Sequence, residues 1–95
     1  MPKANTYKNF SLDKKRFIIA VANWQGKCDK AAGQGDLELA AQYEQDVKDL
    51  TDVFNAIESE DFATAFDLAE AMDTIVRDQI PKRLYNFLAK ENGYN

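Results

Sequence analysis

The sequence predicts an all-α protein: an antiparallel up-down-up three-helix bundle with a short fourth helix after Pro81. In three successive segments, apolar residues alternate at spacings of three and four, which places them on one face of a helix. The connections between these segments are short, and short connections favour antiparallel neighbours. The 95 residues, of which 45% are hydrophobic and 29% charged, are enough for one modest core.

The first predicted helix follows ten residues without periodicity. We expect residues 1–10 to form a flexible or loosely docked arm and residues 11–95 to form a single helical domain. Ser11 offers an N-cap for the helix, and the Gly-Gln-Gly stretch at 33–35 is expected to end it. The apolar stripe of this helix consists of Phe17, Val21, Trp24, Cys28 and Ala31.

Asp36 is the expected N-cap of the second helix, and Ser59 and Asp61 are cap candidates for the third. Pro81 cannot continue a helix but suits the first turn of a short fourth one, which we expect to end near Gly93. The stripe of the second helix consists of Ala40, Tyr43, Val47, Leu50, Phe54 and Ile57. The stripe of the third consists of Phe62, Ala65, Ala69, Met72 and Val76.

Two stretches share one pattern: Ala, four spacers, Asp, an apolar residue, two spacers and Ala. They are "AAGQGDLELAAQ" at 31–42 and "AIESEDFATAFD" at 56–67. Each falls where one predicted helix ends and the next begins, so we interpret the repeat as a helix boundary and not as a binding module. A stacked repeat protein needs about three copies to bury its faces.

The composition argues against most catalytic and metal chemistry. The chain has no histidine and one cysteine, Cys28, which excludes Cys/His zinc sites, Ser-His and Cys-His catalysis, and internal disulfides. We therefore expect no enzyme, no catalytic residue, no metal and no cofactor, and we interpret Cys28 as a small core residue. The longest early apolar run, residues 17–22, is too short for a signal peptide or a membrane span, which predicts a cytoplasmic protein that does not bind membranes.

Charge is distributed unevenly along the chain. Residues 1–35 carry a net charge of +5, residues 36–78 carry −11 and residues 79–95 carry +2. An up-down-up bundle would bring the basic run Lys14, Lys15 and Arg16 beside the acidic residues Glu58, Glu60 and Asp61. The alternative interpretation, a basic patch for nucleic acid, is disfavoured because the acidic body would repel phosphate.

The acidic segment contains two ladders at i, i+3 and i+6 spacing. The first consists of Asp46, Asp49 and Asp52, and the second of Asp67, Glu70 and Asp73. A solvated acidic face is the usual meaning of such patterns, but two parallel ladders could also imitate part of the charge of a nucleic acid. Asp73 is expected to pair with Arg77 at the favourable i, i+4 spacing.

The first helix carries more apolar residues than its core stripe needs. On a helical wheel Leu12 and Ile19 lie opposite that stripe, in line with Gly26 and beside Asn23. Either the helix after Pro81 or the arm covers them, or they contact a partner protein or a second copy of the chain.

These features predict a small non-enzymatic protein-interaction module, an adaptor or regulator that presents a helical surface to another protein. The apolar candidate surface consists of Leu12, Ile19, Asn23 and Gly26, and the acidic candidate surface consists of the two ladders. The alternative function is an acidic inhibitor, of the kind that viruses encode, which blocks a nucleic-acid-binding protein or enzyme through the ladders.

Overall fold

The structure, a computed structural model, describes residues 6–94, so residues 1–5 of the predicted arm lie outside the described residues. In the described part of the chain all regular secondary structure is helical, which confirms the all-α prediction. The helices are α1 (Phe10–Gly33), α2 (Leu37–Glu58), α3 (Phe62–Glu70), α4 (Thr74–Arg77) and α5 (Lys82–Glu91).

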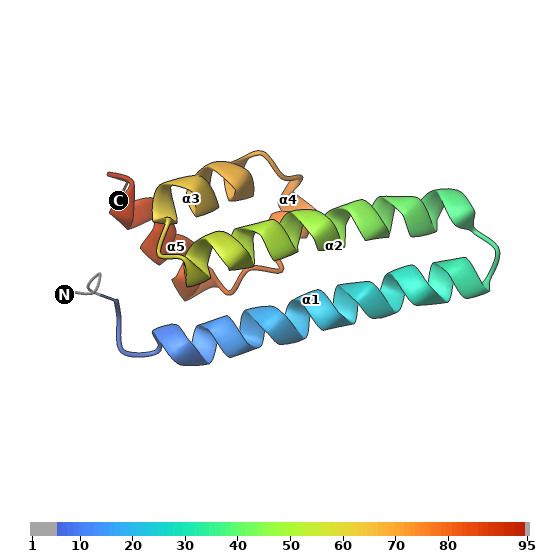
Figure 1. The fold of residues 1–95 in the computed structure, drawn as a ribbon, viewed down its shortest axis with the longest axis horizontal. Helices are drawn as coiled ribbons and strands as arrows, with labels where there is room; N and C mark the ends of the chain where they lie inside the picture. The colour runs from blue at the N-terminus through green and yellow to red at the C-terminus, as the bar shows by residue number, and fades with distance from the viewer. Residues whose placement is uncertain (1–5, 95) are drawn as a thin grey trace.

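The molecule is an elongated helical hairpin with the short helices gathered at one end (Figure 1). The helices α1 and α2 run side by side in opposite directions, and α3 turns back along the C-terminal half of α2. The helix α5 packs against α3 and α1. The molecule measures 49 × 23 × 21 Å along its principal axes, so the end of the hairpin near the α1–α2 turn extends well beyond the short helices.

The main core lies at the end where the short helices gather. Its largest fully buried apolar side chains come from α1, α2 and α5, and α3 adds two fully buried alanines, Ala65 and Ala69. The large side chains are Phe17, Leu50, Val53, Ile57, Leu84 and Leu88. At the far end of the hairpin a smaller cluster joins Cys28, Ala31 and Ala40, with Tyr43 packed against it. Removing such apolar surface from water is the main favourable term in folding, and every predicted stripe residue of α1 and α2 is buried or half-buried.

The turn between α1 and α2 bears out the boundary interpretation of the repeat. The Asp36 amide donates to the Ala31 carbonyl at 3.0 Å, and the Asp36 side chain accepts from the Leu39 amide at 3.1 Å. Gly35, immediately before Asp36, has a φ of 79°, a left-handed conformation that glycine adopts without steric cost. One aspartate thus ends the first helix and caps the second.

The turn between α2 and α3 repeats this arrangement. The Asp61 amide donates to the Ala56 carbonyl at 2.9 Å, and the Asp61 side chain accepts from the Thr64 amide at 3.2 Å. Here the left-handed residue is Glu60, with a φ of 57°. The same spacing of Ala and Asp therefore produces the same pair of bonds at both turns.

Two predicted boundaries are wrong. The first helix begins at Phe10 with Asn9 at the N-cap position, not at Ser11, because the Asn9 carbonyl already accepts from the Asp13 amide at 2.9 Å. The predicted third helix is interrupted: α3 ends at Glu70, and the backbone is extended at Asp73 before α4 begins.

The described part of the predicted arm, residues 6–10, packs on the main core through Tyr7 and Phe10. The Tyr7 ring lies 5.4 Å from the Phe87 ring of α5, centroid to centroid, and the Phe10 ring lies 6.2 Å from the Phe62 ring of α3.

Within residues 6–94, none of the helices combines the length and the apolar character needed to cross a membrane.

Candidate functional site

Among residues 6–94, one charged residue lies in the core. Asp13, in the first turn of α1, is only 1% exposed. The guanidinium of Arg83, in α5, donates to both of its carboxylate oxygens, from Nε at 3.0 Å and from Nη2 at 2.9 Å. The Tyr7 hydroxyl donates to Oδ2 of the same carboxylate at 2.8 Å. This Tyr7–Asp13–Arg83 cluster joins α1, α5 and the segment before α1 with charge-assisted bonds.

The cluster fixes its own protonation states. The hydrogen bonds from Arg83 are the main reason that the pKa of Asp13 lies below its usual 3.8, although burial works in the opposite direction. Burial and the nearby Asp13 carboxylate raise the pKa of Tyr7 well above its usual range. Asp13 is therefore charged and Tyr7 neutral throughout the physiological pH range.

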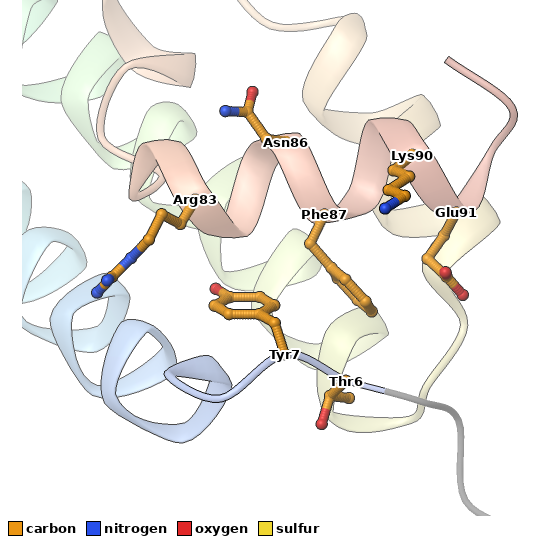
Figure 2. A pocket seen from close by; sticks show the side chains of 7 residues that line it. All are labelled: Thr6, Tyr7, Arg83, Asn86, Phe87, Lys90 and Glu91. Carbon is orange, nitrogen blue, oxygen red and sulfur yellow. The ribbon is translucent and has the colours of Figure 1, made fainter. Parts of the chain in front are cut away.

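A pocket of about 510 Å³ opens beside this cluster, between α5 and the segment before α1. Figure 2 shows Arg83 reaching from α5 toward α1, with the Tyr7 ring below α5 and next to Phe87. The pocket is lined by Thr6, Tyr7, Arg83, Asn86, Phe87, Lys90 and Glu91. Because Arg83 Nε, Arg83 Nη2 and the Tyr7 hydroxyl all donate to Asp13, these groups hold α5 and the segment before α1 against the first turn of α1.

A second candidate site is the side of α1 that faces away from the core. Its exposed residues follow one line along the helix, and we call them the α1 ridge: Leu12, Lys15, Ile19, Ala22, Gly26, Asp29 and Gly33. Leu12 is 45% and Ile19 60% exposed, and Asn23 beside them is also exposed. Within residues 6–94, neither α5 nor residues 6–10 cover Leu12 and Ile19.

The apolar surface continues from the α1 ridge into a groove between α1 and α2. This α1–α2 groove has a volume of about 360 Å³, and Ile18, which is 50% exposed, forms part of its α1 wall. Ala22 belongs to both the ridge and the groove. The groove is lined by Ile18, Val21, Ala22, Gln25, Val47, Thr51 and Phe54.

The acidic ladders do not form two parallel rows of free carboxylates. Asp46 accepts a bond from Trp24 Nε1 at 3.2 Å. Glu70 accepts bonds from Arg77 Nη1 at 3.0 Å and from the Tyr85 hydroxyl at 2.6 Å. Asp73 lies beyond the end of α3, at the N-cap position of α4, so the second ladder does not lie on one helix.

The expected side-chain pair between Asp73 and Arg77 is wrong. Arg77 forms its ion pair with Glu70 instead, at 3.0 Å, because the break after α3 removes the helical i, i+4 geometry on which the expectation depended.

The sequence also predicted that the basic run Lys14, Lys15 and Arg16 approaches the acidic end of α2. This is confirmed for one pair, since Lys14 Nζ lies 2.6 Å from Glu58 Oε2.

Cys28 is buried, and its Sγ lies 3.3 Å from the Ala40 carbonyl oxygen, to which it donates. Burial, reinforced by the charges of Asp29 and Glu44, raises the pKa of its thiol, so it behaves as the small core residue expected from the sequence.

Within residues 6–94, no three His, Cys, Asp or Glu side chains gather where they could hold a metal ion.

Comparison of the chain with models of known protein families, with characterised proteins and with solved structures finds no match. The geometry of the described residues is therefore the basis for any functional assignment.

Sequence reasoning missed several residues of these sites, and Asp13 and Ile18 are the most informative of them. Asp13 lies four positions before Phe17 in the register of the first core stripe, and a charged residue in that register signals a buried ion pair. Ile18 lies next to Ile19 in the chain, but only the packing of α2 beside α1 shows that Ile18 lines a groove.

Proposed function

We propose that this protein is a non-enzymatic interaction module, an adaptor or regulator, that binds another protein through the α1 ridge and the adjoining α1–α2 groove. The observation that carries this proposal is the exposure of Ile18 and Ile19, at 50% and 60%, beside a groove walled by apolar side chains. Contiguous apolar surface of this kind on a small protein is typical of an interaction site. Burying an isoleucine side chain contributes about 1.5 to 3 kcal/mol.

The proposal is supported by the way α1 is held in place on the rest of the molecule. Phe17 and Trp24, on the side of α1 opposite the ridge, fix the helix on the core, and the Asp13–Arg83 pair ties its first turn to α5. A surface that is already ordered loses little conformational entropy when it binds.

The competing function, an acidic inhibitor acting through the carboxylate ladders, has weaker support. Asp46 and Glu70 already accept bonds from side chains of this protein, and Asp73 lies outside α3. Asp52, Asp67 and Asp73 remain exposed, but they lie on α2, on α3 and at the start of α4. Charges separated in this way are too sparse to imitate a duplex, which carries about one charge per 1.7 Å.

The proposal has two further parts. We propose that the module is an up-down-up bundle in which α3 and α4 together occupy the place of the predicted third helix. We also place the protein in the cytoplasm, where a reducing environment keeps an unpaired thiol such as Cys28 reduced.

The test is affinity capture from a lysate of the native cell with three baits: the wild-type chain, Ile19→Asp and Ile75→Asp. Ile75 is the matched control because it is 70% exposed but lies on α4. We expect a partner protein to be retained by the wild type and by Ile75→Asp and lost by Ile19→Asp. The wild type should still retain it when the salt is raised from about 50 to about 200 mM, because most of the contact is apolar.

Equal capture by Ile19→Asp would contradict the proposal. Capture that salt removes and that Asp52→Asn or Asp67→Asn weakens would favour the acidic inhibitor, because screened surface charges then carry the binding.

A further inference from the structure

We propose that the α1 ridge binds a second copy of this chain, with the two α1 helices antiparallel about a two-fold axis at Ala22. This inference rests on the proposed function of the α1 ridge as an interaction surface and names its partner. A two-fold dimer uses the same surface on both subunits, so that surface must be complementary to itself. The α1 ridge meets this requirement in charge, in side-chain size and in spacing.

The spacing of the ridge is that of a helix–helix contact. From Leu12 to Gly33 its residues follow at intervals of three and four in strict alternation, the pattern of a coiled-coil seam. The core stripe of α1 lies on the opposite side and is already packed against α2 and α5. The helix therefore carries two seams, and the ridge, about 32 Å long, is the one that remains open.

Charge fixes the direction and the register of the contact. Lys15 and Asp29 each lie seven residues from Ala22, on opposite sides of it. An antiparallel pair centred on Ala22 sets Lys15 of each copy against Asp29 of the other, which forms two ion pairs. A parallel pair would instead set lysine against lysine and aspartate against aspartate, which is repulsive.

Side-chain size supports the same register. With Ala22 on the axis, the ridge residues of the second copy that lie nearest to Leu12 and Ile19 are Gly33 and Gly26, each displaced by one residue along the helix. Each large side chain therefore has a small residue as its nearest neighbour on the opposite ridge. Sliding one copy by half a heptad in either direction would set Leu12 or Ile19 against Asp29. An apolar contact with a carboxylate desolvates the charge without compensation, so these neighbouring registers are disfavoured.

Gly26 has no role within the chain that would require glycine. It lies inside α1, and a Cβ added there would meet no atom within 4 Å. Glycine in the middle of a helix is destabilising relative to alanine. The stability of a single copy would therefore favour alanine at this position. A neighbouring helix that approaches closely at this position gives the glycine a function.

The two charged ridge residues are accessible for such a contact. Lys15 and Asp29 are both exposed. The Gln25 side-chain amide donates to one Asp29 carboxylate oxygen, Oδ1, at 3.0 Å, and this exposed bond leaves the other oxygen for a lysine of the second copy.

The test is sedimentation equilibrium of the full chain between about 1 μM and about 1 mM, the range in which a weak to moderate dimer dissociates. We expect a monomer–dimer equilibrium for the wild type and for the control Ile75→Asp, and a monomer for Ile19→Asp. Lys15→Asp and Asp29→Lys should each weaken the dimer about tenfold, because each reversal turns two attractive contacts into repulsive ones. The double variant should restore the wild-type dissociation constant to within about twofold, because it exchanges the charges and keeps their pairing.

A monomeric wild type over the whole range would overturn the dimer, as would a dimer that Ile19→Asp leaves intact. Two weak single variants without rescue in the double variant would overturn the register. If the chain is monomeric but Ile19→Asp still loses its captured protein, only this inference fails and the proposed function stands. Failure of both tests would remove both.

A disulfide tests the axis without relying on charge. In Ala22→Cys the new thiol faces its own counterpart, so mild oxidation should yield a covalent dimer. Ala41→Cys, at an exposed position of α2, is the matched control and should yield far less. Helical circular dichroism of each variant shows that it is folded. Equal cross-linking of the two variants would overturn the proposed axis.

Discussion

At the scale of single residues, Asp13 shows how one carboxylate connects distant parts of the chain. It accepts bonds from Tyr7, six residues before it, and from Arg83, seventy residues after it. The carboxylate is withdrawn from water, and its three hydrogen bonds replace the hydration it loses. The cluster holds α5 against the first turn of α1 at the end of the molecule where the main core lies.

Asp13→Ala should lower the free energy of unfolding by about 2 kcal/mol, because it removes three bonds to a charged acceptor while leaving Arg83, half of whose side chain is exposed, able to regain water. Asp52→Ala, at an exposed position, is the control and should change stability by less than about 0.5 kcal/mol. Urea unfolding followed by Trp24 fluorescence measures both. Equal effects of the two variants would mean that the cluster is not a stabilising feature.

The pH dependence of stability gives a second test of the same residue. The pKa of Asp13 is lowered in the folded chain, so its carboxylate stabilises the fold above its ordinary pKa of 3.8, and this contribution is lost as the pH falls through the folded value. The stability advantage of the wild type over Asp13→Asn should therefore shrink below about pH 4. Urea unfolding of both proteins at a series of pH values measures this difference. An advantage that stays constant into acid would contradict the lowered pKa.

At the scale of helices, the periodic stripes predicted α1 and α2 well and α3 poorly. The stripe residues Met72 and Val76 continue the periodicity across the break after Glu70, and both are at least half-buried. The bend at 71–73 contains neither glycine nor proline, so no local signal marks it. An apolar stripe that keeps its spacing across a bend does not reveal the bend, so the sequence joined α3 and α4 into one predicted helix.

The two helix starts at Asp36 and Asp61 were predictable because the chemistry of an N-cap is local. Asp36 and Asp61 cap the helices that follow them, as expected from the repeat. Asp13 was missed for the opposite reason, since its partner Arg83 lies seventy residues away and no spacing rule connects the two.

Gly35→Ala tests the turn between α1 and α2. At a φ of 79° an alanine Cβ is strained, so stability should fall by about 1 kcal/mol. Gly33→Ala is the matched control: Gly33 is the last residue of α1, its φ is not left-handed, and an added Cβ meets no atom within 4 Å. This control should gain up to about 1 kcal/mol through helix propensity. Thermal unfolding at low protein concentration measures both, and equal shifts would show that the turn does not require glycine.

At the scale of the whole molecule, the two sides of α1 have different roles, one in the core and one at the surface. One side of the helix contributes Phe17, Trp24 and Cys28 to the core, and the opposite side presents the α1 ridge. The sequence placed Leu12, Ile19, Asn23 and Gly26 on one face. It could not decide whether α5 covers that face, because this depends on how α5 packs after Pro81.

The overall charge pattern is partly internal. The Lys14–Glu58 pair joins the basic start of α1 to the acidic end of α2, as the uneven charge of the sequence predicted. Both side chains are partly exposed, so the pair contributes at most about 1 kcal/mol.

The central claim is that the α1 ridge contacts another protein chain in the cell. The most direct measurement places a photoreactive phenylalanine analogue at position 19 in the native cell, with the same substitution at position 75 as the control, since Ile75 is 70% exposed on α4. We predict a discrete cross-linked adduct from position 19 and none from position 75. No adduct from position 19, or the same adducts from both positions, would contradict the claim.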